Sequence, residues 1–142
     1  MCMEDPTPTF AYLVKQLKDR FPTLSYVHLI EPMAKGPEYT EGPSHPDASN
    51  DVLREIWGER PFIRAGRFDR EKAIVLVEDS AKDGRVELVA FGKYFISNPD
   101  LPTRLEKGIP LTPYDRSTFY LRGETTTRGY TDYPFAGVDS RM

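Results

Sequence analysis

Two glycines that are each followed by a basic residue could form a site for phosphate. Gly66 precedes Arg67 and Gly92 precedes Lys93, and each glycine directly follows an apolar run that predicts a β-strand. Glycine lets the backbone approach a phosphate closely, its free N–H group donates to phosphate oxygens, and the basic side chains would add positive charge. Ligands of parallel α/β proteins bind beyond the carboxyl ends of the strands. The alternative is that both glycines only turn the chain while the basic side chains point into solvent.

Few other residues offer metal-binding or nucleophilic chemistry. The chain has one cysteine, Cys2, and two histidines, His28 and His45. A single cysteine excludes an internal disulfide framework and a multi-cysteine zinc site, and two separated histidines do not make a metal cluster. His28 lies within an apolar run, so we expect it in the core, and we expect no metal site.

Three apolar runs predict the sheet that must position the glycines. They lie near residues 26–31, 61–65 and 86–91, and the first is expected to be buried on both faces. The strands begin roughly 25–35 residues apart, which is the usual length of one βα unit, so the sheet should be parallel. Three strands are too few for a closed barrel, and the chain is therefore expected to be part of a larger α/β fold.

Helical patterns alternate with these strands. The expected helices begin at Thr7-Pro8, follow a cap at Asn50, extend from about Asp69 to Ser80, and run through Leu101 and Leu105 to Lys107-Gly108. The helix from Asp69 to Ser80 should bury Ala73, Ile74 and Val77. The stretch from Pro32 to Asn50 is rich in Gly, Pro, Ser and Asp, which is typical of a functional or a disordered loop.

The composition limits the classes of partner. The 142 residues suit one domain or part of a larger one, and 19 Lys and Arg against 22 Asp and Glu give a net charge of −3 and a pI near 5.4. This balance provides no basic field for nucleic acid or for an acidic membrane surface. No secretory signal is visible, and the longest aliphatic run, Ala73–Val77, is far too short to span a bilayer. We therefore expect a soluble cytoplasmic protein without a nucleic-acid or membrane partner.

Several strings resemble, in family order, segments of old yellow enzyme-type NADPH dehydrogenases. The most specific is Asn98-Pro99-Asp100-Leu101-Pro102, which follows Phe91-Gly92-Lys93 at the end of the third predicted strand. Similar strings occupy residues 61–66, 114–120, 129–134, 3–6 and 26–32. The resemblance extends over roughly residues 3 to 135.

This resemblance implies a partial (β/α)₈ TIM barrel in an enzyme that binds flavin mononucleotide (FMN). Residues 1–142 would supply the last three βα units of the barrel and, over residues 109–142, an aromatic C-terminal extension. Enzymes of this family take hydride from NADPH onto FMN and deliver it to the β-carbon of an activated alkene such as an enone.

The family's binding residues can be placed on matching positions. Gly66, Arg67, Gly92 and Lys93 fall where the family binds the flavin phosphate. Tyr120 falls where an aromatic residue lines the substrate side of the flavin pocket, and the neighbouring Phe119 is assigned to the cofactor.

The chain also departs from the family. Lys93 stands where the family usually has Arg, so the charge is kept but a planar two-pronged phosphate contact is lost. Arg67 replaces a residue that is usually small or an amide. In the family, earlier strands supply the pair of residues that hydrogen-bond the substrate carbonyl. They also supply the proton-donating Tyr and the contacts to the flavin ring. No catalytic residue is therefore assigned in this chain.

The resemblance therefore predicts an NADPH:flavin oxidoreductase or ene-reductase that is incomplete as an isolated chain. The alternative is a non-catalytic truncated remnant that binds a phosphate ligand weakly or associates with another barrel fragment. Open sheet edges should favour self-association.

Four structural expectations follow from individual residues. Glu31 and Arg64 end adjacent strands and should form an ion pair, and Trp57 should lie in the core. Asp115-Arg116 should be a solvated or capping pair. The aromatic residues of the tail should pack on the outside of the barrel, with Tyr120 alone near the ligand.

Overall fold

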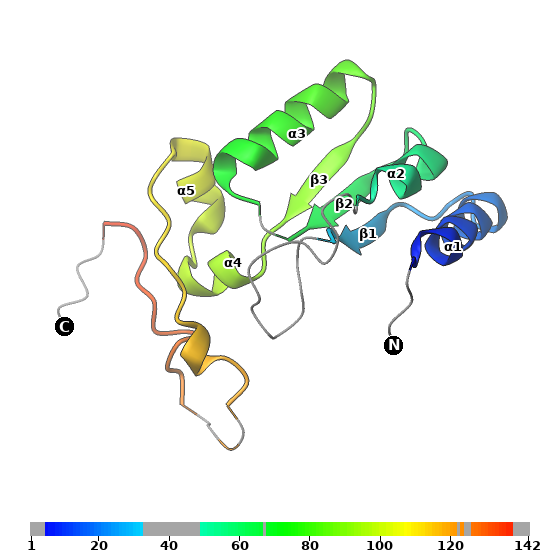
Figure 1. Cartoon of the computed structure of the whole chain (residues 1–142). Helices are drawn as coiled ribbons and strands as arrows, with labels where there is room; N and C mark the ends of the chain where they lie inside the picture. Colours follow the sequence, from blue (N-terminus) through cyan, green and yellow to red (C-terminus); the bar gives the residue numbers. More distant parts are fainter. Residues whose placement is uncertain (1–4, 33–48, 67, 122, 124–125, 138–142) are drawn as a thin grey trace. The chain divides into compact units, whose positions relative to one another are not determined.

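The fold is described by a computed structural model, which describes residues 5–32, 49–66, 68–121, 123 and 126–137. These residues form two compact units, Met1–Ala90 and Phe91–Met142 (Figure 1). Most of the predicted loop from Pro32 to Asn50 lies outside the described residues. Among the described helices, none is long and apolar enough to cross a membrane.

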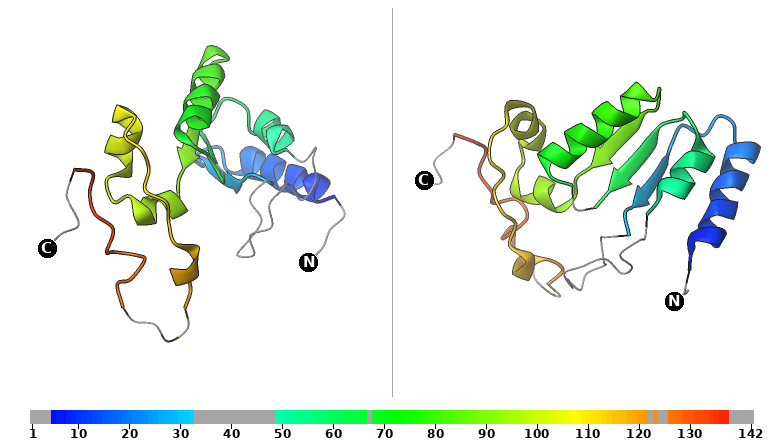
Figure 2. Two further views of the ribbon diagram at one scale, coloured as in Figure 1. Left: turned by 60° about the vertical axis from the view of Figure 1, so that its left-hand side comes forward. Right: turned by 45° about the horizontal axis from the view of Figure 1, so that its top comes forward.

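The first unit contains the predicted parallel sheet. Its elements are α1 (Thr7–Arg20), β1 (Val27–Ile30), α2 (Asp51–Trp57), β2 (Phe62–Ala65), α3 (Arg70–Lys82) and β3 (Glu87–Ala90). The strands are ordered β1-β2-β3 and are parallel throughout (Figures 1 and 2). The three strands predicted from the sequence are confirmed to within about one residue at each end.

One face of this sheet carries the core. Val27 and Phe62 are register partners on neighbouring strands, and both pack with Val14 of α1 and with Leu53 and Trp57 of α2. The Trp57 ring is fully buried, as predicted, and its Nε1 donates to the carbonyl oxygen of Pro61 at 2.9 Å. That bond satisfies the one polar group of the largest core side chain.

Within the described part of the first unit the opposite face of the sheet is open, which contradicts two expectations. Side chains alternate along a strand, and His28, Ile30 and Leu88 are exposed while Val27 and Glu87 are buried. Strand β1 is therefore buried on one face only, and His28 is not a core residue. The predicted strand is confirmed, but within the described part of this unit only one face of the sheet is covered.

Helix α3 forms as predicted but does not bury the residues expected. Ile74 is 36% exposed and Val77 is 41% exposed, and no residue of α3 is buried. The helix packs beside β3, which is the edge strand of the sheet (Figure 1). No other described element of this unit covers the outer side of the helix. Its start is capped, because the Asp69 side chain accepts from the Lys72 amide at 2.8 Å.

The start of α2 differs from the expectation as well. Asn50 occupies the cap position, but its side chain makes no capping bond. Its Nδ2 instead donates to the carbonyl oxygen of Ile30 at 3.1 Å, which ties α2 to the end of β1. The Asp51 amide is satisfied by the Ser49 hydroxyl at 3.0 Å.

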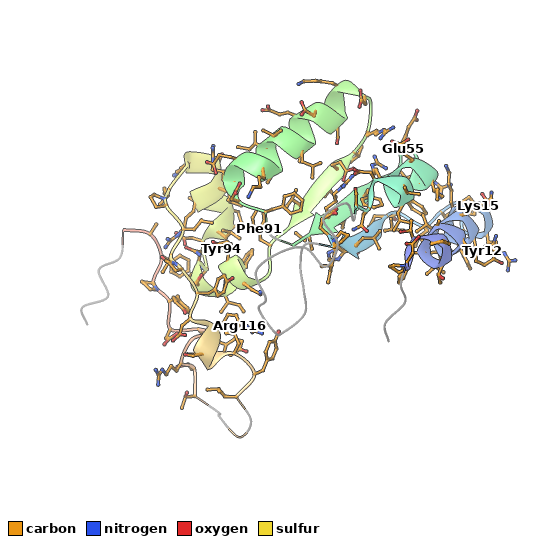
Figure 3. All side chains as sticks on the ribbon, in the orientation of Figure 1. Tyr12, Lys15, Glu55, Phe91, Tyr94 and Arg116 are labelled. Atoms are coloured by element: carbon orange, nitrogen blue, oxygen red, sulfur yellow. The ribbon has the colours of Figure 1, made fainter. Side chains whose placement is uncertain are left out.

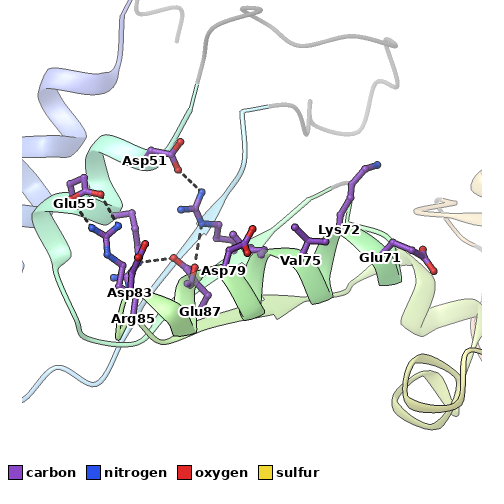
Figure 4. Close-up of a pocket in the computed structure, with 13 residues that line it drawn as sticks. Asp51, Glu55, Glu71, Lys72, Val75, Asp79, Asp83, Arg85 and Glu87 are labelled. Atoms are coloured by element: carbon purple, nitrogen blue, oxygen red, sulfur yellow. Dashed lines mark hydrogen bonds and ion pairs between the residues drawn. The ribbon is translucent and has the colours of Figure 1, made fainter.

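A charged network lies between the covered face and helices α2 and α3 (Figure 4). The buried Glu87 carboxylate is 2.6 Å from Arg54 Nε and 3.4 Å from Arg64 Nε. Arg64 Nη1 also donates to Glu31 at 3.2 Å and to Asp51 at 2.9 Å, so the predicted Glu31–Arg64 pair is confirmed. The network links all three strands to α2.

Burial and charge act in opposite directions on the members of this network. Burial raises the pKa of Glu31, and the positive charge of Arg64 offsets only part of that effect. Burial likewise lowers the pKa of Arg54 although Glu87 acts against it. The hollow beside these groups has a volume of about 720 Å³ and separates α2 from α3.

The second unit is built from short helices and turns. It contains α4 (Lys93–Ser97), α5 (Leu101–Lys107) and a 3₁₀ turn, η1 (Arg116–Thr118). Helix α5 ends at Gly108 with φ +65°, which is the left-handed termination that the sequence predicts. Helix α4 has no counterpart among the predicted elements.

Two buried polar side chains hold this unit together. Asn98 donates through Nδ2 to the carbonyl oxygens of Tyr94 and Thr112, and its Oδ1 accepts from the Thr112 amide at 2.7 Å. Arg104 donates to Asp100 at 2.7 Å and to the carbonyl oxygens of Pro110 and Pro134 at 3.2 Å. Asn98 and Asp100 belong to the most specific family string, and their role in this structure is to fix the chain that follows α5.

Candidate functional site

Strands β2 and β3 end at the same edge of the sheet. Ala65 and Ala90, the last residues of the two strands, are register partners, and the strands are parallel. Gly66 follows Ala65 directly and has φ +105°, a backbone conformation that residues other than glycine rarely adopt. Glycine is therefore required where the chain leaves β2. Arg67, the basic residue of this pair, lies outside the described residues.

Gly92 opens the second unit at the start of α4. Its φ is −99°, so its backbone does not require glycine. A Cβ at this position would meet no atom of the described residues within 4 Å, so among those residues the space beside the Gly92 backbone is unfilled. The placement of Gly66 beside Gly92 and their shared contact with phosphate stay predictions.

Lys93 is linked in the second unit to Phe119 and Tyr120 through the ring of Tyr114. The Lys93 ammonium lies 5.8 Å from the centre of the Tyr114 ring, and that ring stacks on Phe119 at 5.8 Å with an interplanar angle of 24°. Phe119 then meets Tyr120 edge to face at 6.3 Å. Tyr94, which is labelled in Figure 3, and Tyr130 complete the group, which we call the aromatic cluster.

The two residues assigned to the flavin pocket differ strongly in exposure. Phe119 is 8% exposed and lies between Tyr114 and Tyr130, whereas Tyr120 is 78% exposed. Phe119 thus has its ring surface largely covered by other rings of the chain. Tyr120 presents its ring outward and is the better placed of the two for direct contact with a ligand.

Sequence reasoning missed the contribution of Arg116. Asp115 acts as a cap, as expected, because its carboxylate accepts from the Ser117 amide at 2.9 Å. The Arg116 guanidinium does not simply face solvent, because its Cζ lies 5.3 Å from the Phe119 ring centre and 5.4 Å from that of Tyr120 (Figure 3). Its closeness in sequence to two aromatic residues was the available signal, since guanidinium groups favour ring faces.

The described candidate residues suit the binding of a ligand more than catalysis. The described residues contain no group of three or more His, Cys, Asp or Glu that could hold a metal ion. Within the second unit, the unfilled space beside Gly92 and the neighbouring ammonium of Lys93 suit an anion such as phosphate. The aromatic cluster suits a planar group.

Comparisons with known proteins identify the chain's relatives. The family model described as "NADH:flavin oxidoreductase / NADH oxidase family" matches residues 2–112. The chain is 37% identical over 134 residues to the probable inactive dehydrogenase easA of Claviceps fusiformis, which covers 94% of this chain and 34% of that protein. It is 42% identical over 127 residues to a putative NADPH dehydrogenase of Schizosaccharomyces pombe, covering 88% of this chain and 30% of that protein.

The solved structures give the same result. The structure of the old yellow enzyme from Pichia sp. matches with a TM-score of 0.69 and 32% identity, over 94% of this chain and 31% of that one. The chain spans about a third of the length of the curated relatives that it matches. The family strings around Gly66, Gly92 and Asn98 all lie inside the matched region. The chain belongs to the NADH:flavin oxidoreductase / NADH oxidase family, the family of the old yellow enzymes.

Proposed function

We propose that this chain forms the part of an FMN-dependent NAD(P)H oxidoreductase that binds the flavin phosphate. In this proposal β1, β2 and β3 are the last three strands of a (β/α)₈ barrel. The observation that carries it is the common edge at which β2 and β3 end, with Gly66-Arg67 directly after β2 and Gly92-Lys93 two residues after the end of β3. The match of 94% of this chain to 31% of a solved old yellow enzyme supports the assignment to one part of a barrel.

The residues present fit the phosphate of FMN better than its ring. Gly66 and Gly92 would offer backbone N–H groups, Lys93 would offer a charge, and Arg67 would offer a second one. In the same proposal Tyr120 lines the substrate side and Phe119 supports it from within the aromatic cluster. The family's ring contacts come from strands that this chain does not contain, so binding energy should come mainly from the phosphate.

Bound FMN would supply the hydride chemistry: it accepts hydride from NADPH and passes it to the β-carbon of an activated alkene. The residues of this chain would hold the phosphate and line one side of the pocket. No residue among them is assigned as proton donor, and no two are assigned to hydrogen-bond a substrate carbonyl. Catalysis therefore requires the part of the barrel that lies outside these residues.

A second candidate role is non-catalytic, with the chain binding a phosphate ligand or associating with another barrel fragment. The open sheet face favours association, because Ile30 is 65% exposed at the end of β1 and Leu88 of β3 is exposed as well. One relative, moreover, bears the name of a probable inactive dehydrogenase.

Equilibrium dialysis of the purified chain against FMN and against riboflavin tests the proposal. Riboflavin has the same ring but no phosphate. We expect FMN to be retained, riboflavin to be retained at least 10-fold less, and inorganic phosphate to compete with FMN. Equal retention of both flavins, or of neither, contradicts the proposal.

The same preparation shows whether these residues alone are sufficient for catalysis and whether the chain associates. An assay of NADPH oxidation with 2-cyclohexenone should show no turnover above that of free FMN. Turnover well above that level would show that these residues are sufficient for catalysis. Size-exclusion chromatography over a range of concentrations should show association, and a sharp monomer at all concentrations would contradict the association role.

A further inference from the structure

Tyr120 has an exposed side chain on a backbone conformation that is uncommon for residues other than glycine. Its side chain is 78% exposed, and its backbone has φ +59°, which places a residue other than glycine in the left-handed region. Among the described residues it is the one non-glycine with a positive φ. Such strain persists only where the surroundings impose it, and strained residues gather at ligand sites.

Three contacts hold the ring and backbone of Tyr120. Its amide donates to the Tyr130 hydroxyl at 3.1 Å, and its ring meets Phe119 edge to face at an interplanar angle of 80°. The Arg116 guanidinium lies 5.4 Å from the centre of the Tyr120 ring. The ring is thus restrained from the protein side while most of its surface faces outward.

Arg116 links this exposed ring to the buried one. Its Cζ lies at nearly equal distances, 5.3 and 5.4 Å, from the centres of Phe119 and Tyr120. The guanidinium is planar and delocalised, so it can lie against aromatic faces in a way that the compact ammonium of a lysine cannot reproduce. Because Phe119 is packed by Tyr114 and Tyr130, the guanidinium connects Tyr120 to a fixed base.

We propose that Arg116 is a positioning residue that holds the Tyr120 ring outward, ready to stack on a planar ligand. The nature of that ligand rests on the proposed function, in which Tyr120 lines the substrate side of the flavin pocket. The positioning itself is a property of the chain without ligand. The inference can therefore be tested independently of FMN.

The test is NMR on the full chain with labelled tyrosine, in which the Tyr120 signals are assigned with Y120F. In the parent chain the Tyr120 ring protons should be displaced from their random-coil shifts, and its amide should exchange slowly. In R116A at least half of the ring displacement should be lost, and amide exchange should accelerate at least 10-fold. R116K should restore less than half of the lost displacement. R128A, which removes another charge from the same unit at an exposed position, should leave the Tyr120 signals unchanged.

In a uniformly ¹⁵N-labelled sample, the side-chain amide signals of Asn98 report whether the unit stays folded. Asn98 is fully buried and hydrogen-bonded to Tyr94 and Thr112. Unchanged Tyr120 signals in R116A would overturn the proposal. R116M, which keeps a long apolar side chain, is measured in the same way as a second variant beside R116A. Loss of the Asn98 signals in both variants would make Arg116 a general structural residue and would also overturn it.

Titration with FMN separates this inference from the proposed function. R116M should bind FMN within about 2-fold of the parent affinity, while the quenching of flavin fluorescence by Tyr120 decreases by at least half. Absence of FMN binding in the parent chain would contradict the proposed function but would leave the NMR result standing. Equal quenching in R116M and the parent would show that Arg116 does not position Tyr120 toward the ligand.

Discussion

At Gly129 the chain has no space for a side chain. A Cβ at this position would lie 1.9 Å from Thr118 Oγ1, and the backbone has φ +76°. Thr118 in turn is buried and donates to the Asp115 carbonyl oxygen at 2.8 Å, so it cannot easily move aside. The glycine of the family string at residues 129–134 thus permits a close approach of two chain segments beside the aromatic cluster.

Gly129→Ala should therefore destabilise the second unit by about 2–4 kcal/mol, because an unfavourable φ adds to a steric clash. Gly108→Ala is the matched control: Gly108 also has a positive φ, but a Cβ there would meet nothing within 4 Å. The control should cost only about 1 kcal/mol. Chemical denaturation followed by aromatic circular dichroism measures both, and equal losses would show that the contact with Thr118 is unimportant.

Lys93 stands where the resemblance to the family leads us to expect an arginine. An arginine can contact phosphate with two parallel N–H groups, whereas a lysine acts as a point charge. Lys93→Arg should tighten FMN binding roughly 3–10-fold, and Lys93→Ala should weaken it by at least as much. Lys107→Ala, at an exposed position of the same unit, should change the affinity by less than about 2-fold. Weaker binding by Lys93→Arg would contradict the phosphate assignment.

Single residues also show where sequence reasoning succeeds and fails. Glu31 and Arg64 could be paired in advance because they end neighbouring strands on the same face. Arg54 and Glu87 could not, because each is a charged residue that the sequence pattern alone would place in solvent. Their burial depends on the packing of α2 over β2 and β3, which is tertiary information.

Helix α2 is joined to strand β3 and to the segment just before it by two ion pairs that differ in burial. Arg54–Glu87 is almost fully buried, whereas the Glu55 side chain in the Arg85–Glu55 pair is 62% exposed (Figure 4). Glu87→Gln leaves two buried guanidinium groups without their shared carboxylate and should cost about 3–5 kcal/mol. Glu55→Gln should cost less than about 1 kcal/mol. Urea unfolding of the two variants checks this contrast, and similar losses would argue against a structural role for the buried network.

Helix α5 should respond to acid through Asp100. Burial acts to raise the pKa of Asp100, but the Ala136 amide and the Arg104 guanidinium outweigh it and hold that pKa below its ordinary value of 3.8. A carboxyl with a lowered pKa stabilises the fold above its ordinary pKa, and this contribution is lost as the pH falls through the folded-state pKa. Asp100→Asn should thus lower the melting temperature at pH 7.

The difference in melting temperature between Asp100→Asn and the parent should stay constant from pH 7 to about pH 5. It should shrink towards zero below about pH 3.8, as the parent carboxyl becomes protonated. Thermal unfolding followed by circular dichroism at several pH values measures the difference. A difference that grows on acidification would have the wrong sign for this account.

At the level of elements, periodicity and termination signals predicted most of the fold. The three strands, α1 and the Gly108 end of α5 follow from apolar spacing and from residues that favour helix ends. Helix α4 was missed because five residues are too few to establish a 3.6-residue period. The prediction that α3 buries its apolar residues was wrong, because a sequence pattern identifies an apolar helix face but not the element that covers it.

The molecule as a whole corresponds to part of the length of the relatives that it matches. Among the described residues one face of its sheet is open, and the chain covers about a third of the length of these relatives. The family strings indicated this incompleteness because their order matched only one stretch of the family pattern. Spatial grouping of Lys93, Phe119 and Tyr120 through Tyr114 required coordinates, since aromatic side chains in an irregular tail follow no period.

The most direct test of the central claim observes the glycine amides during ligand binding. The chain, labelled with ¹⁵N-glycine at its 10 glycines, is titrated first with FMN and then, in a separate sample, with riboflavin. The account predicts that the amide signals of Gly66 and Gly92 shift together and saturate with FMN, and that riboflavin moves neither. Shifts confined to other glycines, or equal shifts of Gly66 and Gly92 with both flavins, would contradict the claim that these two turns hold the flavin phosphate.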